Sequence, residues 1–226
     1  MDKFSIIMPS YNNAEYLVEA VNSCLDQTYG HFEVIIVNDG STDSTPKLLN
    51  YLSKDGRIKV YNKKNGGPAS DMNYGIEKST GDIICFAASD DIQLKNKLQV
   101  LAETFEQKVD FCYTGYYHGN IYGQPWEEVH PKPLNKENIY NNDCASGGGL
   151  AFRRKVFDKV KFRDMKVNED QAFIWDLYKK KYKYALVDIP TYIYRLLPTG
   201  MSFSRKDEVE KETKKLHKEI DDEKET

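Results

Sequence analysis

The sequence predicts an α/β fold in which a mostly parallel sheet carries helices on both faces. Two observations predict it. Short apolar runs that end at turn-forming residues alternate with segments whose apolar residues recur at helical spacing. This alternation of strand and helix continues from the amino terminus to about residue 91, which is the pattern of parallel strands joined by crossover helices.

The strands of this first part are predicted from runs too short to be helices. They cover residues 4–8, 32–37, 58–61 and 83–87. Helices are predicted between them, beginning near Asn13, Thr45 and Pro68. Asn12 or Asn13 can cap the first helix, and Pro46 is tolerated in the first turn of the second.

The pattern is less regular beyond residue 91. The predicted elements are a helix over 94–105, a strand over 111–117, a strand over 147–152, helices over 156–160 and 169–181, and extended segments over 184–189 and 191–196. The stretch 118–143 lacks a clear period, and its length favours a functional loop.

From Arg205 the chain is almost wholly charged, and residues 205–226 are predicted to form a helical or disordered tail. Four residues lie on one narrow helical stripe: Val209, Thr213, Leu216 and Ile220. Such a stripe would allow packing on this chain or a homodimer through the tail, but the composition favours a solvated or frayed segment.

The composition excludes several classes of protein. The 226 residues carry a net charge of −3, which argues against a nucleic-acid partner. No apolar stretch approaches the ~20 residues of a membrane span, and the amino terminus enters a strand without a signal peptide. The four scattered cysteines indicate free thiols in a reducing cytoplasm. Peripheral contact with the inner face of a membrane remains compatible with these features.

Polar and aromatic side chains follow three of the predicted strands, at Ser10–Asn12, Asp39 and Ser89–Asp91. The carboxyl ends of parallel strands meet at one edge of a sheet, where ligands bind. Tyr11 could stack on a base, Asp39 could accept from the ring N–H of uracil, and Asp90 could hold a cation against a diphosphate. The alternatives are a core aromatic for Tyr11, a turn former for Asp39 and a helix cap for the Asp90 region.

The motifs at these strand ends occur in a familiar order. They are Ile-Ile-Met-Pro-Ser-Tyr-Asn-Asn, Val-Asn-Asp-Gly-Ser-Thr-Asp, Asn-Gly-Gly-Pro and Gly-Asp-Ile-Ile-Cys-Phe-Ala-Ala-Ser-Asp-Asp. Together they resemble the family-2 glycosyltransferases of the bacterial type, strongly over the first ~90 residues and weakly over 147–160, 168–170 and 194–195. The resemblance implies the GT-A fold and a single domain over 1–204, with a nucleotide-sugar half (1–110) and an acceptor half (111–204).

The resemblance also implies a set of site residues. The donor-binding residues would be Pro9, Ser10, Tyr11, Asn12, Asp39, Asn65, Gly66, Asn73, Ser89, Asp90 and Arg195. Asp90 and Asp91 would hold Mg²⁺ or Mn²⁺, and Asp170 would be the catalytic base that takes the acceptor's proton. The acceptor-binding residues would be Trp126, Gly148, Gly149 and Glu169. Without the resemblance, Asp170 is better explained as a carboxylate that complements the helix dipole, with Asn168 as the cap.

The implied activity is inverting, non-processive transfer of a hexosyl or N-acetylhexosaminyl group from a UDP-sugar to a saccharide or lipid-linked saccharide, in cell-surface polysaccharide synthesis. Two departures from the family pattern leave an alternative open. Ala88 stands where the family has the first Asp of Asp-x-Asp, and Met72 stands where it has an Arg. The alternative is a catalytically degenerate UDP-sugar-binding module that serves a partner. A sugar-phosphate nucleotidyltransferase ranks last, because no Gly-rich, Arg-containing loop follows the first strand.

Overall fold

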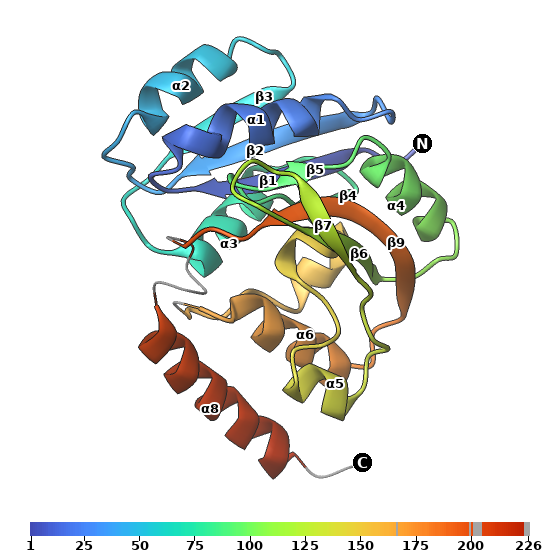
Figure 1. Ribbon diagram of the computed structural model, residues 1–226. Coiled ribbons are helices and arrows are strands. Elements are labelled where there is room, and N and C mark those ends of the chain that lie inside the picture. The colour runs from blue at the N-terminus through green and yellow to red at the C-terminus, as the bar shows by residue number, and fades with distance from the viewer. Residues whose placement is uncertain (166, 199, 201–204, 224–226) are drawn as a thin grey trace.

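The structure is a computed structural model that describes residues 1–165, 167–198, 200 and 205–223. One sheet forms its centre, with helices on both faces (Figure 1). The strands are β1 (Phe4–Ser10), β2 (Phe32–Asn38), β3 (Ile58–Asn62), β4 (Ile83–Phe86), β5 (Ile92–Gln93), β6 (Phe111–Gly119), β7 (Pro125–Val129), β8 (Leu150–Arg153) and β9 (Tyr184–Arg195). The helices are α1 (Ala14–Leu25), α2 (Thr45–Leu52), α3 (Pro68–Lys78), α4 (Lys97–Phe105), α5 (Lys136–Tyr140), α6 (Glu169–Lys179) and α8 (Lys206–Asp222), with 3₁₀ turns η1 (Gly147–Gly149) and η2 (Arg154–Asp158).

The strand order across the described part of the sheet is β3-β2-β1-β4-β8-β6-β9-β5, and β7 pairs with β6. The strands β1, β2, β3, β4, β6 and β9 run in one direction, while β5, β7 and β8 run against it. The prediction of an α/β fold with a mostly parallel sheet is confirmed. The carboxyl ends of β1, β2, β4, β6 and β9 therefore lie along the same edge.

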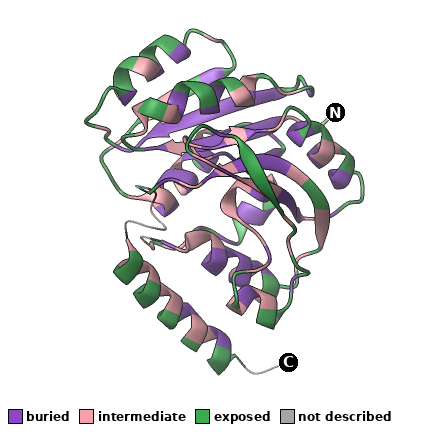
Figure 2. Ribbon diagram, in the orientation of Figure 1, coloured by how far each residue is buried: buried purple, intermediate pink, exposed green. Residues whose placement is uncertain are grey.

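Alternation along the strands divides the core into two clusters, one on each face of the sheet. On β1, Ile6 packs with the cluster formed by α1, α2 and α4, while Ile7 packs with the cluster formed by α3, α6 and η2. Successive side chains of a strand point to opposite faces, so helices are needed on both. Figure 2 shows the buried strands lying between these helices.

Several predicted boundaries differ from the structure. The stretch predicted as a loop, 118–143, contains β7 as the return strand of a hairpin, and the helix α5. The segments 184–189 and 191–196 form one strand, β9, whose register with β6 shifts between Thr114 and Tyr117. Gly147–Gly149 is a 3₁₀ turn rather than the start of a strand. These elements are set by pairing with distant strands, so their local sequence does not mark them.

The carboxyl-terminal segment is a helix packed on its own chain. Leu216 and Ile220 of α8 are buried in the same cluster as Ile139 of α5 and Trp175 of α6. The prediction of a solvated or frayed tail is therefore wrong for Lys206–Asp222. The apolar stripe is covered by this chain and no longer supports a homodimer through the helix. The predicted boundary at 204 and the tail's last residues, 224–226, lie outside the described residues.

The helices of the described residues are all too short or too polar to cross a bilayer.

Candidate active site

The described residues enclose a cavity of about 480 Å³ at the carboxyl edge of the sheet. It lies where the chain after β4 meets β6, η1 and the amino-terminal end of α6. Its lining includes Ala88, Asp91, Thr114, Tyr116, Gly147, Gly148, Glu169, Asp170, Tyr194 and Val209. Asp91, a predicted metal ligand, thus shares one cavity with Glu169 and Asp170, whereas Asp90 is not among the cavity's described lining residues.

Asp170 is half-buried at the start of α6 and is held by two backbone N–H groups. Gly147 N donates to its Oδ2 at 3.1 Å, and Gln171 N donates to its Oδ1 at 2.8 Å. Burial raises the pKa of Asp170 above its ordinary value. Burial, and next the charge of Asp170, raises the pKa of the neighbouring Glu169 to about 8. This environment suits a carboxylate that exchanges a proton near neutral pH.

The carboxylates after β4 differ from one another in accessibility. Asp90 is half-buried, whereas Asp91 is buried and accepts a hydrogen bond from Arg195 N at 2.9 Å. Burial raises the pKa of both groups, and the charge of Asp90 raises that of Asp91 further. Asp90 is therefore the accessible carboxylate, and Asp91 is partly committed to the backbone of β9.

The predicted metal ligands fit a cation that arrives with a diphosphate better than an ion held by protein alone. Among the described residues no group of three or more His, Cys, Asp or Glu side chains could hold a metal. Mg²⁺ commonly uses one or two carboxylates together with phosphate oxygens and water. Asp90 can supply one such ligand.

Arg195 is buried and is paired with Glu19, whose side chain is exposed. The Arg195 side chain is 2% exposed, and its Nη2 is 2.7 Å from Glu19 Oε2. The guanidinium lies over the Tyr16 ring, 4.7 Å from its centroid. Its positive charge thus offsets the charges of nearby carboxylates, those of Glu19, Asp90 and Asp91. This arrangement gives no support to the predicted contact with the donor diphosphate.

The predicted donor-binding residues after β1, β2 and β4 do converge on one edge. Asn12 joins the first two loops, because its Oδ1 accepts from Thr42 N at 2.7 Å. Asn13 Nδ2 donates to Ser89 Oγ at 2.8 Å and joins the first loop to the third. Tyr11 stands at this edge with 45% of its surface exposed, so it is free to stack on a planar ligand.

Two predicted donor-binding residues on β1 expose less surface to a ligand than Tyr11 does. Pro9 is half-buried, and its partner across the parallel pair is Val37. Ser10 is buried, and its Oγ has no hydrogen-bond partner among the described residues. Buried hydroxyl groups usually form hydrogen bonds, so the hydroxyl group of Ser10, at the end of β1, is an exception.

The carboxylate of Asp39 is engaged by the loop that follows β3. It receives hydrogen bonds from Lys63 Nζ at 2.6 Å, Gly66 N at 2.8 Å and Gly67 N at 2.9 Å. Burial alone would raise the pKa of Asp39, but these donors outweigh it and hold the pKa below its ordinary value. Asn65 Nδ2 donates to the Asp39 carbonyl at 3.1 Å, so the whole loop is fixed to the end of β2.

Lys63 also reaches a second carboxylate, that of Asp71 on α3, at 2.8 Å. Burial raises the pKa of Asp71 to about 7. Asp71 precedes Met72, which stands where the family resemblance implies an Arg. The cation in this region therefore comes from Lys63, which the sequence analysis did not single out.

Asn73 has a structural partner that accounts for both polar atoms of its side chain. Its Nδ2 donates to Phe162 O at 2.8 Å, and Phe162 N donates to its Oδ1 at 3.1 Å. We therefore assign Asn73 to holding the Phe162 segment against α3 rather than to the donor. Asn73 and Gly66 line a second cavity, of about 850 Å³, between α3 and the segment 154–164.

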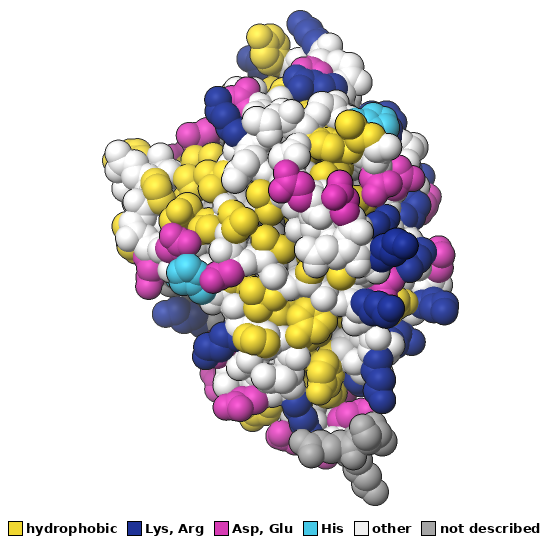
Figure 3. All heavy atoms as spheres, turned by 90° about the vertical axis from the view of Figure 1, so that its right-hand side faces the viewer, with side chains coloured by type: hydrophobic (Ala, Val, Ile, Leu, Met, Phe, Trp, Pro, Cys, Tyr) yellow, Lys and Arg dark blue, Asp and Glu magenta, His cyan; other side chains and the backbone are white. Residues whose placement is uncertain are grey.

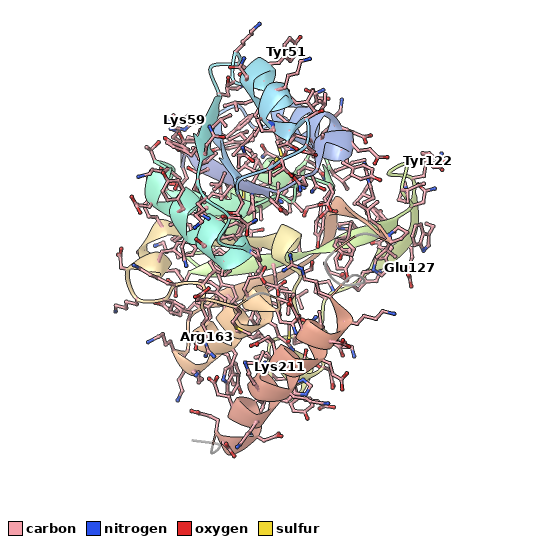
Figure 4. The ribbon with its side chains drawn as sticks, turned by 90° about the vertical axis from the view of Figure 1, so that its left-hand side faces the viewer. Tyr51, Lys59, Tyr122, Glu127, Arg163 and Lys211 are labelled. Atoms are coloured by element: carbon pink, nitrogen blue, oxygen red, sulfur yellow. The ribbon has the colours of Figure 1, made fainter. Side chains whose placement is uncertain are left out.

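The predicted acceptor residues divide into two groups. Glu169 and Gly148 line the active-site cavity, whereas Gly149 is buried where an added Cβ would lie 2.9 Å from Thr114 O. Trp126 is 55% exposed on β7 and is not among the cavity's described lining residues. Figure 4 shows Tyr122 and Glu127 of the same hairpin at the outer edge of the molecule. Hydrophobic side chains also gather on the face of the molecule that lies to the right in Figure 1, which Figure 3 shows from the front.

The buried side chain of Lys97 forms hydrogen bonds to residues on two sides of the cavity. Lys97 Nζ donates to Phe86 O at 2.9 Å, Gln93 Oε1 at 2.6 Å and Gly148 O at 2.7 Å. It joins the end of β4 to the turn whose first residue holds Asp170. Sequence reasoning missed Lys97, and the available signal was a charged residue at an apolar position of a helix.

Comparison with known proteins identifies the family. The model of glycosyl transferase family 2 matches residues 5–161. The chain therefore belongs to glycosyl transferase family 2, and its fold is of the GT-A type.

Two relatives show the range of similarity. The putative teichuronic acid biosynthesis glycosyltransferase TuaG of Bacillus subtilis is 32% identical over 96% of this chain and 88% of TuaG. An uncharacterized glycosyltransferase of Rickettsia bellii is 40% identical over 56% of this chain, but the match spans 19% of that protein.

Solved structures agree with this assignment. Staphylococcus aureus TarS 1–349 in complex with UDP-GlcNAc has a TM-score of 0.74 and 25% identity, over 89% of this chain and 61% of that one. A mannosyltransferase of Pyrobaculum calidifontis, PcManGT, has the same TM-score at 17% identity over all of this chain and 66% of its own, and shows the fold alone.

Proposed function

We propose that this chain is an inverting, non-processive glycosyltransferase that moves a sugar from a UDP-sugar to an acceptor hydroxyl. The observation that carries the proposal is the single cavity lined by Asp91 after β4 and by Asp170 at the start of α6. A donor held at the first site and an acceptor held at the second would meet there. The structure of TarS with UDP-GlcNAc supports a uridine nucleotide as the donor.

Asp170 takes the acceptor's proton in this mechanism. The acceptor oxygen attacks the anomeric carbon, a new C–O bond forms, and the bond to the diphosphate breaks with its electron pair leaving on UDP. The hydrogen bond from Gly147 N orients Asp170, while burial keeps its pKa high enough for proton transfer. Burial and the charge of Asp170 raise the pKa of Glu169, so its carboxyl group would keep its proton to higher pH than an ordinary Glu and would donate a hydrogen bond to the acceptor.

The donor lies across the carboxyl edge of the sheet. Tyr11 would stack on the base, and the rigid pair of Asp39 and Lys63 would present an acceptor and a donor to it. Asp90 would hold Mg²⁺ or Mn²⁺ with the diphosphate, and the bound cation would neutralise the charge of the leaving group.

We further propose that residues 1–204 act as one domain, with a donor half over 1–110 and an acceptor half over 111–204. The acceptor would be a saccharide or lipid-linked saccharide in cell-surface polysaccharide synthesis, which the similarity to TuaG supports. A cytoplasmic site of action, peripheral to the inner membrane face, agrees with the four free and buried cysteines.

One experiment tests the central proposal. Wild-type protein should release UDP from at least one UDP-sugar in the presence of Mn²⁺, and the Asp170→Asn variant should bind UDP as tightly while turnover falls by about 10²–10⁴-fold. An unchanged rate in the variant would exclude Asp170 as the base.

A degenerate UDP-sugar-binding module is the second candidate, favoured by Ala88 in the lining of the cavity and by the buried Met72. Calorimetry with UDP separates the two. Binding that does not tighten with Mn²⁺, together with no turnover of any UDP-sugar, would favour the module, whereas turnover would exclude it.

A further inference from the structure

The charged helix α8 extends from the core to the active-site cavity along one stripe. Leu216 and Ile220, in its carboxyl-terminal half, are buried (Figure 2). One and two turns earlier on the same stripe lie Thr213 and Val209, which are half-buried. The stripe that the sequence shows therefore has an apolar anchor at one end and two residues near the active site at the other.

The anchor is reinforced by a polar cluster around Glu219. Its carboxylate accepts hydrogen bonds from Arg163 Nη1 at 2.7 Å, Lys179 Nζ at 2.8 Å and Trp175 Nε1 at 3.1 Å. The two cations and the indole come from the segment before α6 and from α6 itself. His217 adds a stacked contact with Tyr140 of α5, with ring centroids 3.7 Å apart. Because several donors converge on one carboxylate, α8 is fixed in rotation as well as position.

Thr213 contacts the residue that begins the catalytic helix. Asn168 Nδ2 donates to Thr213 Oγ1 at 2.6 Å. Asn168 adopts a left-handed backbone conformation, with φ of 59°, and its side chain does not cap α6. Such a residue is held by its surroundings. Its neighbours in sequence are Glu169 and Asp170, so the contact with Thr213 bears on the orientation of both carboxylates.

Val209 lines the same cavity as Asp170. Val209 belongs to α8, which packs against α5 and α6 (Figure 1). A larger side chain at this position would fill part of the space, whereas Lys211 on the exposed side of the same turn (Figure 4) would not.

We propose that α8 is part of the acceptor site. Val209 forms one wall of the cavity that receives the acceptor saccharide, and Thr213 is a positioning residue for the turn that carries Glu169 and Asp170. The inference rests on the proposed function, because it takes this cavity as the place where the acceptor binds.

The first test changes the size of residue 209. With UDP-GlcNAc as donor, the acceptors would be a panel of p-nitrophenyl glycosides. The Val209→Trp variant should lose transfer to every glycoside that the wild type uses by at least about tenfold, while its affinity for UDP stays within about twofold of the wild-type value. Lys211→Trp is the matched control and should behave as the wild type in both assays. Transfer at the wild-type rate by Val209→Trp would overturn the assignment.

The second test needs no turnover. The titration of Asp170 would be followed by NMR in the wild type, Thr213→Val and Thr213→Ser, with thermal unfolding as the check on folding. Thr213→Val removes the acceptor of Asn168 Nδ2, so the turn that carries Asp170 should loosen and expose its carboxylate more to solvent, and the titration midpoint of Asp170 should fall by about one pH unit. Thr213→Ser keeps the hydroxyl and should restore the midpoint.

Other charged groups near Asp170 must be followed in the same spectra. They are Glu169 on α6, Asp91 after β4, Tyr116 on β6, Tyr194 on β9, and His130, Lys132 and Asp143, which line the cavity from the β7–η1 segment. Identical midpoints in the wild type and Thr213→Val would overturn the positioning role. A wild-type chain that neither binds UDP nor hydrolyses UDP-sugars would instead contradict the proposed function and remove the acceptor role of Val209 with it, while the Asp170 titration would still decide the role of Thr213.

Discussion

Gly147 N donates a hydrogen bond to Asp170 Oδ2 at 3.1 Å, across 23 residues of sequence. This contact joins the turn η1 to the helix α6 at the centre of the cavity. It favours the ionised form of a carboxylate whose pKa is raised by burial. The balance of these two effects sets the pH at which Asp170 can accept a proton.

Removing this donor should shift the pH dependence of the reaction. In the Gly147→Pro variant the N–H is absent, and Ser146, with φ of −112° and ψ of 148°, already has the extended conformation that precedes proline. Loss of a hydrogen bond to a charged group is worth about 1.5–3 kcal/mol, so the pKa of Asp170 should rise by about 1–2 units. The limb of kcat that rises with pH should move to higher pH by that amount.

Gly147→Ala is the control for this variant. It keeps the N–H, and its Cβ would lie 3.5 Å from Asp170 Oδ2, an ordinary van der Waals distance. The limb should stay near its wild-type position. A folded Gly147→Pro protein whose limb coincides with that of the wild type would refute the role of the hydrogen bond.

The accessible carboxylate after β4 should control metal-dependent binding of the donor. We expect Asp90→Asn to weaken UDP binding in Mn²⁺ by about tenfold or more and to abolish the effect of the metal, because a cation ligand is lost. Calorimetry with UDP in Mn²⁺ and in EDTA measures both. Asp26→Asn, at an exposed carboxylate paired with Lys95, is a matched control that should retain the full metal effect.

The buried carboxylate of Asp71 should make stability depend on pH. Its pKa rises from an ordinary 3.8 to about 7 on folding, so the folded state binds more protons than the unfolded state between these values. The free energy of unfolding should therefore fall, as pH rises from 4 to 7, by a few kcal/mol at most relative to Asp71→Asn. Urea unfolding of both proteins across this range checks the slope. Parallel curves for the two proteins would show that Asp71 does not titrate in this way.

The contribution of the Glu219 cluster to the free energy of unfolding should depend on pH in the opposite sense from that of Asp71. The hydrogen bond from Arg163, which is the main cause, lowers the pKa of Glu219 to about 2 from an ordinary 4.5. Its contribution is complete above about pH 4.5 and is lost as pH falls towards 2. Glu219→Gln should lower the free energy of unfolding by about 1 kcal/mol at pH 7, since the site is partly exposed, and by less at pH 3. Equal losses at the two pH values would contradict the ion pairing.

The fold was predictable where local sequence decides the structure. The short apolar runs of Phe4–Ser10 and Phe32–Asn38, and the turn residues that end them, define strands whose parallel pairing aligns Ser10 with Asn38. The convergence of Tyr11, Asp39 and Asp90 on one edge follows from that pairing. The β7 strand was missed, and β9 was predicted as two extended segments rather than one strand, because their hydrogen bonds to β6 are not encoded in a local period.

The partners of individual side chains were less predictable. Asn73 pairs with Phe162 across 89 residues, and Arg195 with Glu19 across 176. Their residue types suit a nucleotide equally well, so a motif match does not distinguish the two uses. Lys63 could not be identified because its role depends on Asp71, a residue that departs from the family pattern.

The position of β8 between β4 and β6 has a consequence for how the chain folds. The four strands β1–β4 can pair as soon as they are synthesised, yet β4 keeps an open edge until Leu150–Arg153 inserts beside it. Closure over so long a loop is slow, and an unpaired strand edge invites association with other chains. A fragment that stops before residue 150 should therefore aggregate, and efficient folding of this enzyme depends on a four-residue strand that closes the sheet late.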